Sequence, residues 1–553
     1  MSTQISLSAN QSQTAPGPPT GAQASRLHPV DRATSDDASE TLALQSHAVA
    51  AGKVRPGSLG SLLLYGSAAL GLAVGLERVL GFLSGVLAAR IAGPQVFGAY
   101  SMVLATAGTI AAYAGAGIGT TAMRFSGQYR PGTRGYRKFI AALAIIATGS
   151  ATAAALVMIA GAAPLAQLVL RNESLTSFLR IAAVSSAAIV LLECCRGLFL
   201  GQQKFQALLA LSLTSGIGLL IVMPFAARVS AGMMVLGQAL VATACVLICL
   251  AVSKRLGLWP EPDERSNEGP GIRPVFAFGL VQFGAFAGVS IATWWIASLV
   301  VRSDATLTQM GLYAIANQFR GLVALAPGLC AQVGYSLLTD QSGSEYGGAA
   351  RVTLANSFLA SSLATMGAVI GIVFAPWLLA LIFGKSFAGA EAPILILLAT
   401  GIVHMSGVPA AQRLSIVDLR AVGVINAIWA VVTAAMGIWL VPKAGATGAA
   451  LAFLISHTVS QVLVTAALAR IGELPRGYLS LFGVTTFGAF IMAGLGYWRE
   501  FELNRNPLTI ALAASAVFIF AVLLAVGRRI GCLPKLRSIR FRYPRGQSDL
   551  ARS

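Results

Sequence analysis

Long apolar runs separated by short polar loops dominate the chain from about residue 60 to residue 527. Fourteen of these runs reach or approach the ~20 residues that an α-helix needs to cross the hydrocarbon core of a membrane. The runs are unbroken, whereas the strands of a membrane β-barrel alternate polar and apolar positions. The pattern therefore predicts an all-α polytopic membrane protein with about 14 transmembrane helices. The expected spans are 61–91, 97–119, 139–163, 177–200, 207–227, 231–252, 274–301, 309–338, 352–375, 391–411, 421–441, 447–469, 477–498 and 507–527.

A short motif repeats at an offset of 213 residues. FGAYS at 97–101 matches MGLYA at 310–314, which aligns Gly98 with Gly311. Six spans separate equivalent points, so both halves keep the same orientation in the membrane, as in transporters built from parallel repeats. We therefore expect two six-helix lobes that face each other across a cavity, with two extra C-terminal helices.

The loops predict the orientation and the domain order. Lys and Arg number 23 in one set of alternate loops and 8 in the other, and the positive-inside rule then places both termini in the cytoplasm. The N-terminal segment is rich in Ser, Thr, Gln and Pro, which is typical of disorder. The expected domains are a disordered cytoplasmic tail (1–57), an N-terminal lobe (58–252), a cytoplasmic linker (253–273), a C-terminal lobe (274–470), two extra helices (471–530) and a basic cytoplasmic tail (531–553).

Composition excludes several classes of protein. Residues are 56% hydrophobic and 11% charged, whereas about a quarter of the residues of a soluble domain are charged. The net charge of +19 resides mostly in loops, where it follows topology, so we expect no nucleic-acid partner. Phosphate-binding loops and zinc-type cysteine spacing are both missing from the sequence, so we expect no enzyme activity, no cofactor and no metal.

Six charged side chains lie three or more residues from either end of a predicted span. A charge costs about 2.5–3.5 kcal/mol in the membrane unless it faces protein or a water-filled cavity, so each marks a candidate site. Glu77 and Arg78 are adjacent and point about 100° apart on a helix, so each needs another partner. Glu193 and Arg196 have the i, i+3 spacing of a helical ion pair. The six are Glu77, Arg78, Arg180, Glu193, Arg196 and Arg320.

Arg78 and Arg320 lie deepest and come from different lobes. A guanidinium stays charged and matches phosphate oxygens with two parallel hydrogen bonds, which favours a site for an anionic headgroup between the lobes. We expect Glu77, Glu193 and Arg196 to line the same cavity. Interhelical salt bridges that only set packing are the alternative.

Two further pairs of residues have two interpretations each. His404 and His457 lie within spans and either relay protons or bond to the backbone. Trp294 and Trp295 either stack on sugar rings or pack within the bundle.

LGFLSGVLAARIAGPQVFGAYSMVLA at 80–105 resembles the first helices of the polysaccharide-flippase branch of the multidrug/oligosaccharidyl-lipid/polysaccharide exporter superfamily. GLYAIANQF at 311–319 and LIFGKSFAGAEAPILILL at 381–398 are similar to later stretches of that family. The related lipid II flippases usually carry an Arg–Asp pair where this chain has Ser84 and Gly85.

The resemblance implies a V-shaped two-lobe carrier that works by alternating access. It implies a flippase that moves polyprenyl-pyrophosphate-linked oligosaccharide across the bacterial inner membrane for exopolysaccharide, capsule or O-antigen biosynthesis. Basic cavities are typical of the family, which matches Arg78 and Arg320. The expected partners are this lipid-linked substrate and membrane lipids, with a polysaccharide polymerase and glycosyltransferases as further candidates. A drug/cation antiporter of the same superfamily and a non-transporting scaffold for glycosyltransferases are the alternatives.

Overall fold

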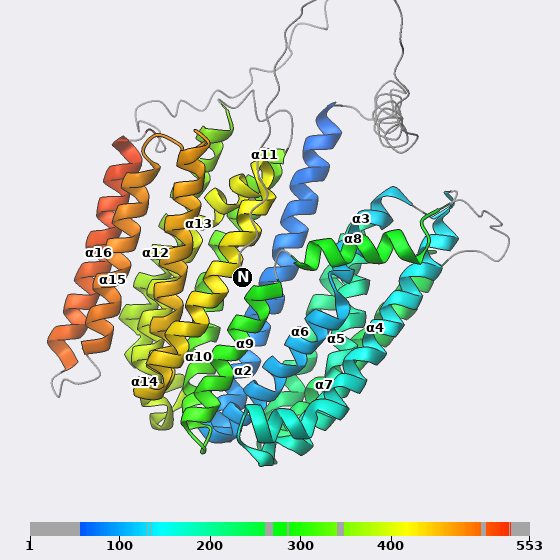
Figure 1. Cartoon of the computed structure of the whole chain (residues 1–553), viewed down its shortest axis with the longest axis horizontal. Helices are drawn as coiled ribbons and strands as arrows, with labels where there is room; N and C mark the ends of the chain where they lie inside the picture. The colour runs from blue at the N-terminus through cyan, green and yellow to red at the C-terminus, as the bar shows by residue number, and fades with distance from the viewer. Residues whose placement is uncertain are drawn as a thin grey trace, which may run out of the picture. The chain divides into compact units, whose positions relative to one another are not determined.

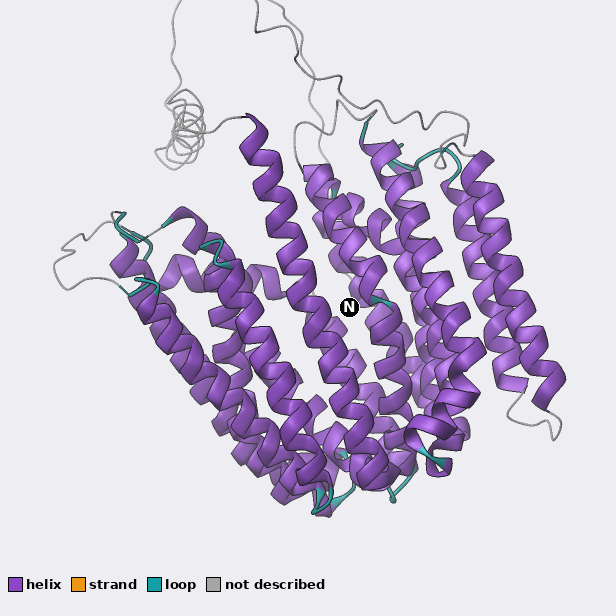
Figure 2. Ribbon diagram, turned by 180° about the vertical axis from the view of Figure 1, so that it is seen from behind, coloured by secondary structure: helices purple, strands orange, loops and turns teal. Residues whose placement is uncertain are grey.

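The computed structural model describes residues 56–129, 131–133, 135–259, 269–284, 287–339, 348–498, 505–529 and 531. The chain divides into two compact units, Met1–Tyr65 and Gly66–Ser553, and the first contributes only the start of α2 to the described residues. Every regular element among the described residues is a helix (Figure 2), which confirms the all-α class. The expected tails at 1–57 and 531–553 lie almost entirely outside the described residues.

Helices follow one another along the second unit with short connections (Figure 1). Ten helices within the described residues are long and apolar enough to cross a membrane, while the count of fourteen spans stays a prediction. The helices are α2 (Pro56–Gly115), α3 (Ile118–Gln128), α4 (Tyr136–Pro164), α5 (Thr176–Gly201), α6 (Phe205–Ala227), α7 (Ala231–Arg255), α8 (Ile272–Gly284), α9 (Ala287–Ser303), α10 (Thr308–Val323), α11 (Leu325–Thr339), α12 (Ala349–Leu378), α13 (Glu391–Val417), α14 (Leu419–Arg470), α15 (Tyr478–Trp498) and α16 (Arg505–Arg529).

Backbone breaks interrupt the two longest helices. Gly93 in α2 has φ 76° and ψ 169°, and Pro94 then starts the next helical segment, in the interval expected between spans 61–91 and 97–119. A proline fits the first position of a helix because its missing N–H has no helical partner there. In α14 the break falls at Ala444 and Gly445. Each break therefore separates two helical segments that are merged under one label.

Two expected spans are each divided into shorter helices. Span 274–301 contains α8 and α9, and span 309–338 contains α10 and α11. The second division falls at Ala324, just before Pro327, whose ring disfavours a continuous helix. Figure 1 shows α8 running across the bundle, where it contacts α3 and α4, whereas α9 contacts α14. The two parts of the seventh expected span therefore pack against different halves of the chain.

Helix contacts divide the bundle into two groups. In the first group α5 packs against α3, α4 and α7, and α6 packs against α7. In the second group α13 packs against α10, α12 and α14. Helices α15 and α16 pack against each other and against α13 and α12, at one edge of the bundle (Figure 1). The boundaries expected for the two lobes remain a prediction.

Repeated glycines meet at the contact between the two groups. A Cβ atom on Gly98 of α2 would overlap the carbonyl oxygen of Leu307, and a Cβ atom on Gly311 of α10 would overlap that of Pro94. Only glycine permits so close an approach of two backbones. The two aligned positions of the repeat therefore pack reciprocally, as in a pseudo-twofold arrangement.

Polar side chains add two further contacts at the same end of the bundle. Arg90 Nη1 donates to the carbonyl oxygen of Leu381 at 2.7 Å, and Asn172 Nδ2 donates to that of Ala305 at 3.3 Å. The first bond joins α2 to the segment between α12 and α13, and the second joins the segment between α4 and α5 to the segment between α9 and α10. We call the region around Arg90, Gly98, Asn172, Leu307 and Gly311 the Gly93 end, and it is closed in this structure.

Candidate functional site

A cavity of about 820 Å³ lies between the two groups of helices, and we call it the charged cavity. Its walls come from α2, α3, α5, α6 and α10. Four of the five charged residues expected at the site line it. They are Glu77, Arg78, Glu193 and Arg196.

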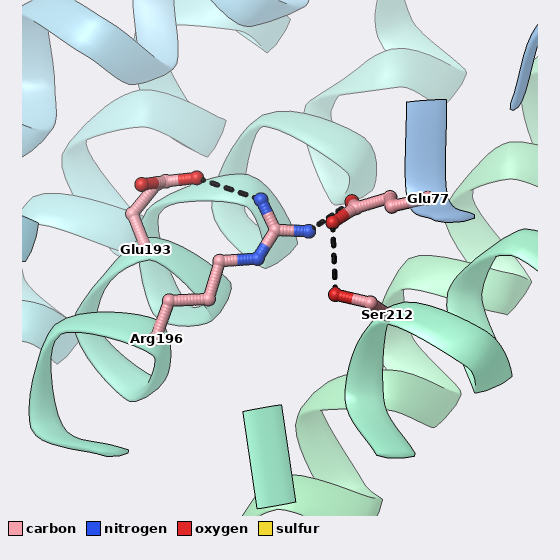
Figure 3. A network of polar contacts seen from close by, with 4 residues as sticks. All are labelled: Glu77, Glu193, Arg196 and Ser212. Carbon is pink, nitrogen blue, oxygen red and sulfur yellow. Dashed lines mark hydrogen bonds and ion pairs between the residues drawn. The ribbon is translucent and has the colours of Figure 1, made fainter. Parts of the chain in front are cut away.

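An ion-pair network joins three helices in the wall of the charged cavity (Figure 3). The guanidinium of Arg196 on α5 pairs with Glu77 Oε1 on α2 through Nη2 and with Glu193 Oε1 through Nη1, the latter at 3.1 Å. Ser212 Oγ on α6 donates to Glu77 Oε2 at 3.1 Å. The expected pair Glu193–Arg196 is therefore confirmed, and Arg196 is also the partner that Glu77 required.

Arg78 also lines the charged cavity, but no described residue forms an ion pair or hydrogen bond with its guanidinium. Neighbouring helical residues point about 100° apart, so Glu77 can turn toward α5 and α6 while Arg78 turns elsewhere. The four charges of the cavity cancel formally. Arg196 is shared by two carboxylates, so Arg78 is the cation that is available to an anion.

Arg320 lies apart from the other four residues and is not in the lining of the charged cavity. Its Nε donates to Asn317 Oδ1 at 2.9 Å, and its guanidinium lies 5.5 Å from the ring centre of Phe453. Asn317 does line the cavity, one helical turn earlier on α10. The structure therefore places Arg320 behind the wall, in contact with a wall residue.

The two histidines stack on each other inside the second group. Their ring centres are 4.4 Å apart, and His457 also stacks on Phe453 at 6.2 Å. His404 comes from α13 and His457 from α14. Both side chains therefore belong to the packing between these helices, and His457 shares the Phe453 ring with Arg320.

A second cavity of about 650 Å³ shares the wall residues Gly81, Leu219, Asn317 and Gln318 with the charged cavity. Trp294 lines it, whereas Trp295 does not. We call it the neutral cavity, because the residues that line it include no Asp, Glu, Lys, Arg or His. The sequence reasoning overlooked its amide residues, although an Asn or Gln within an apolar span is itself a signal of a polar contact.

No group of three or more His, Cys, Asp or Glu residues within the described part of the chain is placed to hold a metal ion. The polar groups gathered around the cavities instead suit an organic ligand with an anionic part.

Comparison with known proteins agrees with the expected family. Residues 63–335 match the family model described as "Polysaccharide biosynthesis protein". The resemblance seen in the sequence is confirmed. No curated protein matches the chain in sequence.

Solved structures show the same fold. The chain is similar to the lipid II flippase MurJ in an inward closed conformation, with a TM-score of 0.57 and 14% identity over 83% of this chain and 98% of that one. It is also similar to a multidrug resistance MATE family transporter of the MOP superfamily in an inward-facing conformation (TM-score 0.51, 11% identity, 73% and 99% covered). An outward-facing transporter of the same description gives a TM-score of 0.52 at 14% identity, with 76% and 96% covered. The chain is thus a multi-pass membrane protein with the fold of these transporters and flippases.

Proposed function

We propose that this protein is a flippase for polyprenyl-pyrophosphate-linked oligosaccharide in the bacterial inner membrane, serving exopolysaccharide, capsule or O-antigen biosynthesis. The observation that carries the proposal is the unpaired Arg78 guanidinium in the charged cavity between the two groups of helices. An anionic headgroup is the ligand that such a guanidinium binds best. The match to the polysaccharide family supports the sugar part of the cargo.

The proposed path follows from the orientation expected from the basic loops. Met123 and Leu200 line the charged cavity close to the loops expected in the cytoplasm, while the Gly93 end, expected in the periplasm, is closed. The headgroup enters from the cytoplasm, Arg78 holds the phosphates, and the prenyl tail stays in lipid. Rocking of the two lobes then opens the Gly93 end and releases the headgroup outside.

The other charged residues take supporting roles in this proposal. Glu77 and Glu193 orient Arg196 from two sides, which keeps its guanidinium at the cavity wall. Arg320 is a positioning residue that acts through its hydrogen bond to Asn317. The cytoplasmic loops and tail contact anionic lipid headgroups, and a polymerase and glycosyltransferases are the proposed protein partners.

Reconstitution tests the proposal without other proteins present. Proteoliposomes that contain the purified full chain are loaded with polyprenyl pyrophosphate carrying a fluorescent disaccharide, and a membrane-impermeant quencher reports the outer leaflet. We expect translocation by the wild type, which also excludes a non-transporting scaffold. Arg78→Ala should reduce translocation at least tenfold, because the phosphates lose their cation, while Arg78→Lys should retain part of it.

Arg180→Ala is the matched control, because Arg180 also lies within an apolar helix but does not line the charged cavity. It should translocate normally. Equal translocation by Arg78→Ala and wild type would contradict the proposed site. Efflux of a cationic dye from the same vesicles, without movement of the lipid, would favour the drug/cation antiporter instead.

A further inference from the structure

The neutral cavity is walled by hydroxyl, amide and aromatic side chains from both groups of helices. Tyr100 Oη donates to Gln238 Oε1 at 3.2 Å on the side of α2 and α7. Trp294 Nε1 of α9 donates to Thr106 Oγ1 at 3.0 Å and so ties the cavity-lining Trp294 to α2. These bonds fix the orientation of the two aromatic rings in the wall. A ring fixed in this way offers a rigid apolar surface beside groups that form hydrogen bonds.

Among the described residues, two polar atoms of the side chains that line the neutral cavity are buried and have no hydrogen-bond partner. They are Tyr313 Oη and Gln318 Oε1, both on α10. A buried polar group without a partner costs about 1–3 kcal/mol, and a ligand hydroxyl in the cavity would supply that partner. Asn317, between them in the wall, uses its Oδ1 for Arg320 and keeps its amide N–H groups. Helix α10 therefore presents both donors and acceptors, as a polyhydroxylated ligand requires.

Asn317 and Gln318 line both cavities, so the charged and neutral cavities are adjacent. The neutral cavity extends from there toward the Gly93 end, where Tyr100 and Tyr313 lie close to Gly98 and Gly311 in sequence. A ligand that holds its anionic group at Arg78 thus has its next part at the amides of α10. The ligand thus meets charged side chains in the first cavity, and uncharged hydrogen-bonding and aromatic side chains in the second.

We propose that the neutral cavity is the binding site for an uncharged sugar, and that the sugar joined to the pyrophosphate of the cargo carries no carboxylate or amine. This inference rests on the proposed function and extends it to the chemical class of the cargo. Aromatic faces pack against the C–H face of a pyranose, while its hydroxyls bond to the amides of Asn317 and Gln318 and to the Tyr313 hydroxyl. The volume of about 650 Å³ lies in the range of ~300–1,000 Å³ that is typical of small-molecule sites.

The same wall disfavours an acidic sugar. Moving a carboxylate from water into a site without a countercharge is costly, and the lining of the neutral cavity has no Lys, Arg or His to compensate. Arg320 lies behind the wall with its Nε bonded to Asn317 Oδ1, and Arg78 is engaged by the phosphates. For a uronic acid next to the pyrophosphate, the cost of desolvation therefore offsets the gain from hydrogen bonds.

Binding of three lipids to the full chain in nanodiscs tests the inference. The probes are polyprenyl pyrophosphate alone, the same lipid with one glucose, and the same lipid with one glucuronic acid. We expect the glucosyl lipid to bind about tenfold more tightly than the bare lipid, and the glucuronosyl lipid to bind no more tightly than the bare lipid. Equal affinity for the glucosyl and bare lipids, or for the two glycosylated lipids, overturns the inference.

Two variants assign the effect to the wall of the neutral cavity. Trp294→Leu and Tyr313→Phe change residues that line only the neutral cavity, so each should remove the advantage of the glucosyl lipid and leave the affinity for the bare lipid unchanged. Trp295→Leu is the matched control, because its neighbouring ring packs in the core and does not line the cavity. It should keep the tenfold advantage even where the thermal stability falls. Loss of the advantage in Trp295→Leu, or its survival in both wall variants, also overturns the inference.

Failure of the proposed function gives a different result. If the bare lipid fails to bind while the glucosyl lipid binds and depends on Trp294, the pyrophosphate site is wrong and the sugar site stands. If the bare lipid binds and glucose adds nothing, the sugar site is wrong and the phosphate site stands. If none of the three lipids binds, both are wrong.

Discussion

Charge is distributed unevenly among the residues of the charged cavity, although it cancels in sum. Arg196 is held by Glu77 and Glu193, so this cluster carries one excess negative charge, and Arg78 carries the balancing positive charge. In the proposed function, an incoming pyrophosphate binds near Arg78 and is repelled by the carboxylates. The affinity of the site for phosphate is therefore limited by Glu77 and Glu193, which favours release as well as binding.

Neutralising Glu77 should strengthen binding of the bare lipid. Glu77→Gln removes one negative charge from the cavity wall and frees one edge of the Arg196 guanidinium. Because partly exposed ion pairs contribute at most about 1 kcal/mol, we expect the Kd for polyprenyl pyrophosphate to fall by up to about fivefold. Calorimetric titration of the protein in nanodiscs measures this change. Weaker binding by the variant would show that Glu77 is needed for more than balancing charge.

Glu473→Gln is the control for that titration. Glu473 pairs with Arg413 at 2.9 Å, in the second group of helices and outside the lining of both cavities. Breaking this pair removes the same charge from the chain and should leave the affinity for the lipid unchanged.

The sequence predicts the ion pair that lies within one helix but not the ion pair that joins two helices. The Glu193–Arg196 pair is readable because helical spacing alone brings i and i+3 together. The Glu77–Arg196 pair joins residues 119 apart, and only the packing of α2 against α5 determines it. Arg320 was expected beside Arg78 because both residues lie deep within their spans. The depth of a residue in a span does not determine the face of the helix from which its side chain extends.

At the scale of elements, the closed Gly93 end depends on two glycines that occupy the same place in the repeat. Gly98 meets the backbone at Leu307, and Gly311 meets the backbone at Pro94. In the proposed alternating-access cycle this contact must form and separate in each cycle. Direct backbone contact makes the closed state tight.

Filling that contact should destabilise the closed state of the Gly93 end. Gly98→Val places side-chain atoms where the Leu307 carbonyl now lies, and overpacking of this kind costs about 1–3 kcal/mol. The equilibrium between closed and open forms should then shift roughly 5- to 150-fold toward open. Spin labels at Asn172→Cys and Ala305→Cys, in a background without native cysteines, report the distance across this end. The shift should appear as a larger fraction of molecules with a long distance between the labels.

Gly149→Val is the matched control, because a Cβ atom at Gly149 of α4 meets no atom within 4 Å. Its distance distribution should equal that of the parent protein. An unchanged distribution in Gly98→Val would mean that the contact at Leu307 does not govern closure.

The elements themselves were largely predictable. Apolar length indicated the helices, and Gly93–Pro94 indicated the first break, because both signals are local. The division of the seventh span was not predictable, since no proline separates α8 from α9. Its cause is tertiary: α8 contacts α3 and α4, and the hydroxyl of Tyr113 donates to the carbonyl oxygen of Ala287 at 2.6 Å.

At the scale of the whole molecule, the proposed cycle assigns binding to the cavities and release to the opening of the Gly93 end. Binding requires only the open cavity with Arg78 in its wall, whereas transport also requires the Gly93 end to separate. The two functions are therefore expected to respond differently to a restraint at that end. A protein that merely stores or presents the lipid would show no such difference.

A reversible cross-link across the Gly93 end should stop transport and spare binding. Asn172 and Ala305 are joined by a hydrogen bond of 3.3 Å, so cysteines at these positions lie within reach of a short bis-methanethiosulfonate reagent. The cross-linked protein should bind polyprenyl pyrophosphate with unchanged Kd but lose at least nine-tenths of its translocation, because the two groups of helices can no longer part. Reduction should restore translocation, and either single cysteine should be insensitive to the reagent. Full translocation by the cross-linked protein would mean that the headgroup leaves by a path that does not open the Gly93 end.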